Sequence, residues 1–211
     1  MKTPLEIVIA TANRHKLEEI LQIWDNVPWK IFSLKDFPHI PPIPETGSTF
    51  EENARIKAEA VFQRTGLITL ADDSGLEVDF LDGAPGIFSA RYAGKERDYA
   101  ANNAMLLRQL KGVPRKKRGA QFRCVVFIRG KDINHAVEGI VRGHIGEELR
   151  GTHGFGYDPL FIPDGCQQTF AEMGSELKNQ ISHRAMAFKK AKEFLEKFLT
   201  NKLNSSQDTS D

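Results

Sequence analysis

Two neighbouring carboxylates are the residues of this sequence best suited to hold a metal ion. Asp72 and Asp73 begin the polar segment 72–75, which follows the apolar run 67–71. Neighbouring side chains of a strand point to opposite faces, so one carboxylate can enter a cleft while the other tethers a neighbouring loop. A carboxylate outside the carboxyl end of a strand is well placed to hold Mg²⁺, although the same segment also fits a turn that closes the strand.

A polar turn near the N-terminus is suited to binding phosphate. It connects a buried strand to a helix and consists of Thr11, Ala12, Asn13, Arg14, His15 and Lys16. The first N–H groups of a helix are unpaired and carry partial positive charge, and Lys16 adds a full charge. Thr and Asn are also common helix caps, so the turn is also explained as a capped helix start.

Two further charged residues lie around the start of the next helix. Glu45 follows the proline-rich loop 38–44, which fixes its approach, although a lone glutamate in a loop is commonly solvated. Lys57 shares a helix face with Asn53, four residues before it, and can reach a phosphate or face solvent.

Aromatic residues in the C-terminal third are suited to a nucleobase. In Gly154-Phe155-Gly156-Tyr157-Asp158, two glycines flank an aromatic residue. This pattern presents Phe155 and Tyr157 for stacking, and Asp158 can accept hydrogen bonds from a base edge. An aromatic-anchored turn in the core explains the same pattern.

A group of basic residues precedes and begins the last helix. Lys178 comes before Ser182, a natural N-cap, and His183 and Arg184 fall in the first turn. Positive charge there opposes the helix dipole, so an anionic or polar group should compensate it. Such a conflict with local rules is expected at a functional site.

Strands and helices must alternate to position these residues. Apolar runs and helical spacing predict an α/β fold in which long antiparallel strands extend a strand–helix core. Strands are predicted at 5–10, 29–34, 67–71, 78–81, 122–129, 135–145 and 160–162. Helices are predicted at 16–24, from a capping box at 48–51 to about residue 64, at 99–110 and at 183–199. The polar tail 204–211 is expected to be disordered.

Composition limits the classes of function. The chain has 211 residues, 40% hydrophobic and 27% charged, which suffices for a core without disulfides. Its net charge of +1 argues against coating duplex nucleic acid, and the basic run 115–118 is expected to be solvated surface. Cys124 and Cys166 lack metal-binding spacing and are expected to be reduced thiols of a cytoplasmic protein. No apolar run approaches the roughly 20 residues of a membrane span, and no signal peptide is expected.

Five stretches of the sequence closely resemble the inosine/xanthosine triphosphate pyrophosphatase family. They are IVIATANRHK, ETGSTFEENARIKAEA, ADDSGLEVDFLDGAPGIFSARYAG, GFGYDPLF and ISHRAMA, and they extend in family order from residue 7 to residue 187. The resemblance implies a mixed, elongated, twisted central sheet with flanking helices. It also implies two lobes around a nucleotide cleft, formed as one domain by residues 1–203.

The resemblance implies an activity as well. Members of the family hydrolyse deaminated purine nucleoside triphosphates (ITP, dITP and XTP) to the monophosphate and pyrophosphate with Mg²⁺, which cleanses the nucleotide pool. They are commonly homodimers. We therefore expect a cytoplasmic, magnesium-dependent enzyme that acts on purine nucleoside triphosphates and has no membrane or stable nucleic-acid partner.

Each candidate site residue has a counterpart in the family. Glu45 and Asp73 match its metal-associated positions, and Asp73 also matches the residue usually assigned as proton acceptor. The turn Thr11 to Lys16 and Lys57 match positions near the phosphates, and Ser74 matches a substrate contact. The residues that match the segment around the base are Phe155, Gly156, Tyr157 and Asp158. Those that match the purine carbonyl edge are Lys178, His183 and Arg184. Ala12 stands where many members carry glycine, so the turn there requires an ordinary backbone angle or a slightly wider path.

Two other functions stay open at this point. The same pocket could sense nucleotides without catalysis and signal through a partner. Alternatively, the run 115–118 could bind nucleic acid, which predicts strongly salt-dependent retention on single strands.

Overall fold

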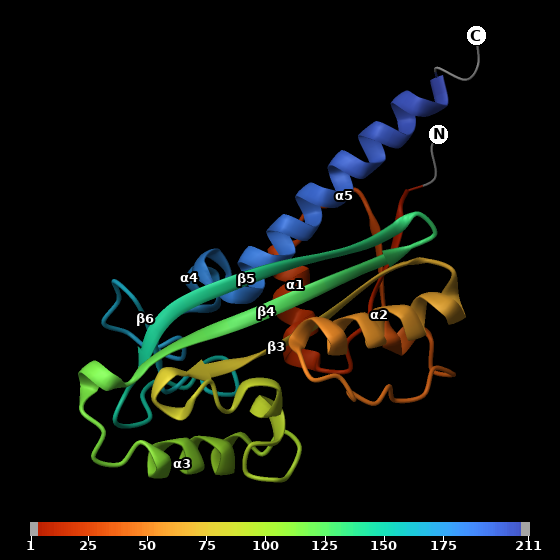
Figure 1. The fold of residues 1–211 in the computed structure, drawn as a ribbon. Coiled ribbons are helices and arrows are strands. Elements are labelled where there is room, and N and C mark those ends of the chain that lie inside the picture. Colours follow the sequence, from red (N-terminus) through yellow and green to blue (C-terminus); the bar gives the residue numbers. More distant parts are fainter. Residues whose placement is uncertain (1–3, 208–211) are drawn as a thin grey trace.

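The computed structural model describes residues 4–207 and contains a six-stranded sheet with helices on both faces (Figure 1). The strands are β1 (Glu6–Ile9), β2 (Lys30–Ser33), β3 (Ile68–Val78), β4 (Gly119–Gly130), β5 (Ile133–Ile145) and β6 (Phe161–Pro163). The helices are α1 (Arg14–Ile23), α2 (Phe50–Thr65), α3 (Tyr99–Gln109), α4 (Ser175–Ile181) and α5 (His183–Gln207). A 3₁₀ segment, η3 (Gly86–Arg91), follows β3.

The sheet is mixed and its long central strands join two lobes. The strand order is β2-β1-β3-β4-β5-β6, with β1 parallel to β2 and β3 and every later pair antiparallel. One core, with Leu106, Phe122 and Phe161, lies at the end of the sheet that carries α3 and β6. Two other cores cover the opposite end, where β1, α1 and α2 lie (Figure 1). The predicted α/β fold is confirmed.

Buried strand β1 explains how the sheet holds helices on both faces. Ile7 and Ile9 pack with α5 on one face, while Val8 packs with α2 on the other. Because side chains alternate along a strand, a strand covered on both faces reads as a continuous apolar run. On α2, Ala54, Ala58 and Val61 are all fully buried there.

The predicted strand end at Asp72 is wrong. Strand β3 continues from Ile68 to Val78 as one element, and the segment predicted as a strand at 78–81 is instead a 3₁₀ turn. Antiparallel pairing with β4 runs unbroken from Thr69 to Val78, so these ladder hydrogen bonds override the turn preference of Asp, Ser and Gly. Strand β1 stops at Ile9, beside Leu70. The carboxylates therefore lie beyond the end of β1, in mid-strand of β3.

Helix boundaries differ from the predictions in smaller ways. Helix α2 is capped by Thr49, and Glu52 bonds to Ser48, so the predicted capping box is shifted by one residue. Helix α4 was not predicted. Helix α5 extends to Gln207, into the segment predicted as a tail, and residues 208–211 lie outside the described residues.

The basic run 115–118 is only partly surface. Arg118 is buried, and its guanidinium donates to the carbonyl oxygens of Leu110, Ile145 and Gly146. The burial of Arg118 contradicts the prediction of a solvated loop. Three carbonyl acceptors take the place of the water molecules to which an exposed guanidinium would donate.

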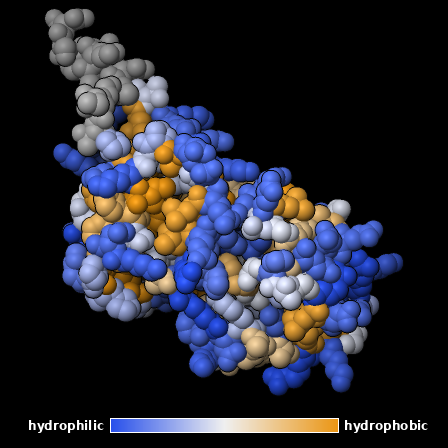
Figure 2. All heavy atoms as spheres, turned by 180° about the vertical axis from the view of Figure 1, so that it is seen from behind, coloured by the Kyte–Doolittle hydropathy of each residue, from blue (hydrophilic) through white to orange (hydrophobic). Residues whose placement is uncertain are grey.

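The outer surface is mostly hydrophilic in the view from behind, with apolar side chains gathered below the C-terminal end (Figure 2). None of the helices in the described part of the chain is long and apolar enough to span a bilayer.

Candidate active site

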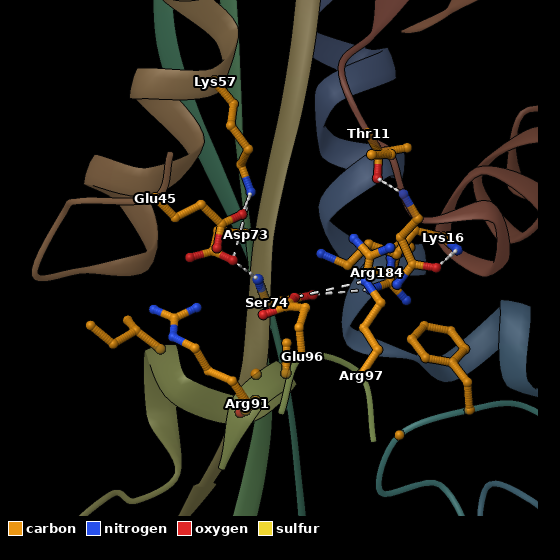
Figure 3. Close-up of a pocket in the computed structure, with 18 of the residues that line it drawn as sticks. Thr11, Lys16, Glu45, Lys57, Asp73, Ser74, Arg91, Glu96, Arg97 and Arg184 are labelled. Carbon is orange, nitrogen blue, oxygen red and sulfur yellow. Dashed lines mark hydrogen bonds and ion pairs between the residues drawn. The ribbon is translucent and has the colours of Figure 1, made fainter. Parts of the chain in front are cut away.

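A cleft of about 770 Å³ lies between the two lobes. Its walls come from the turn before α1, from α2, β3 and η3, from the loop after β5, and from the start of α5. It brings together all the residues matched to the family's site except Arg14 and His15, and of the two neighbouring carboxylates it is lined by Asp73 but not by Asp72. The sequence patterns therefore converge on one site (Figure 3).

Glu45, Lys57 and Asp73 form a cluster at one end of the cleft. The Lys57 Nζ lies 2.6 Å from Glu45 Oε1 and 3.8 Å from Asp73 Oδ1. Buried Asn53 joins the two acidic segments, since its Nδ2 donates to Asp73 Oδ2 (3.0 Å) and its Oδ1 accepts from the Gly47 N–H (2.8 Å). Asn53 thus fixes the Glu45 loop relative to strand β3, a role that its helix position alone did not reveal.

The two carboxylates of this cluster fit a hydrated divalent cation. Both approach the same Lys57 ammonium, so one cationic group already lies beside both carboxylates. In the part of the chain described, no cluster of three or more His, Cys, Asp or Glu side chains offers a complete protein cage. Mg²⁺ usually takes one or two carboxylates and keeps waters or substrate phosphates as its other ligands, which suits this pair.

The electrostatics of the cluster differ between its two acids. Burial raises the pKa of Asp73 above its ordinary value, and the nearby Lys57 only partly opposes this. Burial also acts to raise the pKa of Glu45, but the effect of the nearby Lys57 ammonium is larger, so the pKa of Glu45 is lowered. Asp73 is therefore the better proton acceptor of the pair.

Asp72 points to the opposite face of β3, as predicted for one of two neighbouring carboxylates. Its Oδ2 lies 2.8 Å from Lys16 Nζ and 3.7 Å from Arg184 Nη2. Burial would raise the pKa of Asp72, but these cations hold it far below its ordinary range. Arg184 also donates to Ser74 Oγ (3.0 Å), so Asp72 anchors side chains that line the cleft without lining it itself.

The polar turn before α1 is a capped helix start. Asn13 is the N-cap, and its Oδ1 accepts from the His15 N–H (3.0 Å) and the Lys16 N–H (3.5 Å). Thr11 Oγ1 accepts in turn from the Asn13 N–H (3.2 Å). Ala12 does not have a positive φ, so the ordinary backbone angle expected there is confirmed. The turn still lines the cleft and presents Lys16 from α1.

Phe155 is a half-buried aromatic ring at the other end of the cleft. His15 stacks on it at 5.4 Å between ring centroids, and Lys178 Nζ lies 5.1 Å from the ring centroid. Tyr157, predicted to be presented for stacking, is instead buried in the core and donates to the Ser89 carbonyl (3.0 Å). A phenol hydroxyl with an internal acceptor can be buried, which the sequence could not show.

Asp158 holds the Phe155 turn together. Its buried Oδ2 accepts from the Phe155 N–H (2.8 Å) and from Lys178 Nζ (2.6 Å). A Cβ at Gly154, which has φ +74°, would lie 2.1 Å from that same oxygen. Asp158 is thus engaged with the protein itself, although it was predicted to accept hydrogen bonds from a base.

Glu19 supplies the anionic partner predicted for the basic start of α5. Its carboxylate lies 2.6 Å from Lys178 Nζ and also accepts from Arg184 Nη1, and Asp72 adds a second negative charge. Glu19 was not predicted. It follows Lys16 by three residues on the same face of α1, and that spacing is the signal that could have found it.

His183 is a neutral residue of the cleft wall. Its ring stacks on Phe122 at 4.6 Å, and Nδ1 is buried without a hydrogen-bond partner. Burial lowers its pKa well below the ordinary value, and the Arg184 and Lys178 charges add to the effect. It therefore faces a ligand as an uncharged imidazole.

Comparison with known proteins identifies the family. The profile of the Ham1 family matches residues 7–194. The chain belongs to the Ham1 family. The dITP/XTP pyrophosphatase of Bacillus licheniformis is 49% identical over 193 residues, which cover 90% of this chain and 98% of that protein. The dITP/XTP pyrophosphatase of Bacillus subtilis is 47% identical, with coverage of 90% and 97%.

Solved Ham1 structures share the whole fold. The HAM1 protein from Coxiella burnetii is 40% identical with a TM-score of 0.83, covering 92% of this chain and 99% of its own. The Staphylococcus aureus Ham1 protein is 41% identical with a TM-score of 0.81, at 90% and 98% coverage. The family resemblance found in the sequence motifs is confirmed, as is the mixed sheet with flanking helices.

Three residues of this Ham1 chain line the cleft although none was predicted there. Arg91 ends η3, and Glu96 and Arg97 follow it; Figure 3 shows Arg91 on the side of Glu45 and Asp73 and Arg97 on the side of Arg184. Arg97 has φ +58°, and its N–H donates to the Ala90 carbonyl (2.6 Å), so the chain turns back here. The signal in the sequence was the SARYAG end of the longest matching stretch, which contains Arg91.

Proposed function

We propose that this chain hydrolyses deaminated purine nucleoside triphosphates to the monophosphate and pyrophosphate, so that these nucleotides do not enter DNA or RNA. The observation that carries the proposal is a single cleft with an acid–lysine cluster at one end and an aromatic ring among buried cations at the other. The first end suits a metal-bound polyphosphate and the second a purine. The names of the two Bacillus relatives support the same substrates.

The reaction requires a water, a base and charge stabilisation. We propose that Asp73, whose pKa is raised by burial, accepts a proton from the attacking water. The water oxygen bonds to the α-phosphorus, the bond to the bridging oxygen breaks, and that oxygen leaves with pyrophosphate. Glu45 and Asp73 would hold Mg²⁺, which when bound neutralises phosphate charge. Lys57 beside Glu45 and Lys16 beside Asp72 both line the cleft and would offset the remaining charge.

Selectivity for deaminated purines would come from hydrogen-bond donors. Hypoxanthine and xanthine carry a carbonyl at C6 where adenine carries an amino group. Lys178 and Arg184 are permanent donors held by Glu19, and neutral His183 retains one ring N–H. An amino group facing these donors leaves polar groups unpaired, at about 1–3 kcal/mol for each.

A substrate panel tests the proposal. Phosphate release coupled through inorganic pyrophosphatase is expected with ITP, dITP and XTP in the presence of Mg²⁺, and little release is expected with ATP. Phe155→Ala should raise KM for ITP, since the base loses its stacking surface. Binding of ITP without turnover would reject the enzyme hypothesis and support a nucleotide sensor. Equal rates for ATP and ITP would contradict the proposed specificity.

The cellular setting is proposed on the same basis. We expect a cytoplasmic homodimer without a stable nucleic-acid partner, as the family resemblance implies. Light scattering on the purified chain tests the dimer, and salt-dependent retention on single-stranded DNA would instead support nucleic-acid binding.

A further inference from the structure

Both lysines at the phosphate end of the cleft already have carboxylate partners. Lys16 lies 2.8 Å from Asp72, and Lys57 lies 2.6 Å from Glu45. An ion pair offers a phosphate much less net attraction than a free cation, because its partner repels the phosphate.

The cations at the base end are paired as well. Lys178 contacts Glu19 and Asp158, each at 2.6 Å. Arg184 contacts Glu19 and lies 3.7 Å from Asp72. A triphosphate carries several negative charges, more than one divalent cation cancels, so the cleft needs a further cation that is not already neutralised.

Arg91 meets this requirement. Of the cleft-lining cations in the described chain, it is the one without a carboxylate within 4.0 Å; even Arg97 has Glu96 at 3.8 Å. Its guanidinium carbon lies 5.3 Å from the centroid of the Phe88 ring. Figure 3 shows Arg91 rising from η3 toward the Glu45 and Asp73 carboxylates. Its guanidinium therefore points to the phosphate end.

The backbone that carries Arg91 is held firmly. Buried Asn102 donates to the carbonyls of Ser89 and Ala90 at 3.4 and 3.3 Å. Ser89 Oγ accepts from the Leu76 N–H of β3 (2.9 Å). A Cβ at Gly75 would lie 2.4 Å from that hydroxyl, so the missing side chain lets η3 pack directly on the strand. A fixed backbone reduces the entropy that Arg91 loses on binding a ligand.

We propose that Arg91 binds the β- and γ-phosphates of the substrate and the same groups of departing pyrophosphate. This assignment rests on the proposed pyrophosphatase function. A guanidinium matches phosphate oxygens with two parallel hydrogen bonds, which an ammonium cannot do. Cleavage between the α- and β-phosphates leaves new negative charge on the β-phosphate, and Arg91 stabilises that charge from the side of the cleft opposite Lys57.

Arg91→Ala, Arg91→Lys and the control Arg108→Ala test the assignment. Arg108 is an exposed arginine on α3 that does not line the cleft. In calorimetry with Mg²⁺ present, Arg91→Ala should weaken pyrophosphate binding at least tenfold and leave IMP binding unchanged. Its kcat/KM for ITP should fall by about 10²–10³-fold, as for loss of one donor to a developing anion. Arg91→Lys should recover part of both losses.

Three results would overturn the assignment. First, Arg91→Ala could bind pyrophosphate as tightly as the Arg108→Ala control does. Second, the affinity of Arg91→Ala for IMP could fall as much as its affinity for pyrophosphate. Third, Arg91→Lys could bind pyrophosphate no better than Arg91→Ala. The proposed function fails separately: if the wild-type chain bound pyrophosphate through Arg91 but left ITP intact, the enzyme would be rejected and the phosphate site retained.

Discussion

Replacing each of the two neighbouring carboxylates of β3 with asparagine should separate stability from catalysis. Asp72 is buried between Lys16 and Arg184, so Asp72→Asn leaves the partly buried Lys16 and the buried Arg184 short of one negative charge. Breaking a buried ion pair from one side costs about 3–5 kcal/mol. For a chain of this size, each kcal/mol lowers Tm by about 2–4 °C, which gives a loss of roughly 6–20 °C.

Asp73→Asn should have the opposite profile. The folded-state pKa of Asp73 is raised, so at neutral pH its ionisation opposes folding, and a neutral amide removes that penalty. Its Tm should therefore be unchanged or higher. Turnover of ITP should fall at least about 10²–10⁴-fold, the usual contribution of a general base.

Thermal unfolding and ITP hydrolysis measured on both variants at neutral pH give the comparison. Asp72→Asn is expected to melt early, whereas Asp73→Asn is expected to be stable and inactive. If Asp73→Asn lost as much Tm as Asp72→Asn, or retained full activity, the assignment of opposite roles to the two faces of β3 would be refuted.

Three further predictions concern other parts of the cleft. His15→Ala removes the ring stacked on Phe155 and should raise KM for ITP by about 2–10-fold, with recovery in His15→Phe; an unchanged KM in steady-state assays would show that the stack does not position the ring. Because the folded-state pKa of His183 lies below the unfolded value, the unfolded chain binds the extra proton below about pH 6.5. Denaturant titrations should therefore show stability falling as pH drops, by at most about 1.4 kcal/mol per pH unit, and the slope should flatten in His183→Asn. Chelation of Mg²⁺ should stop turnover, and Glu45→Gln should raise the half-saturating Mg²⁺ concentration at least tenfold; an unchanged requirement would exclude Glu45 from the ion.

Local sequence signals predicted what depends on neighbours in the chain. Asn13 caps α1 and Gly66 ends α2 in a left-handed conformation, since both are decided within one helical turn. The predicted long antiparallel strands at 122–129 and 135–145 are the hairpin of β4 and β5. These are the parts of the fold in which propensity and tertiary contacts agree.

Long-range contacts account for what was missed. Asp72 looked like a strand end because its partner strand β4 is about fifty residues away in the chain. Glu19 and Lys178 are 159 residues apart, so no local pattern links them. Buried Tyr157 and Arg118 looked like surface residues because their acceptors are backbone carbonyls, which every residue carries.

Hydrolysis of ITP in H₂¹⁸O tests most directly whether the cleft delivers water to the α-phosphorus. Mass spectrometry of the products should find the heavy oxygen in IMP and none in pyrophosphate. Heavy oxygen in pyrophosphate, or release of IDP with inorganic phosphate, would contradict the attack assigned to the water beside Asp73.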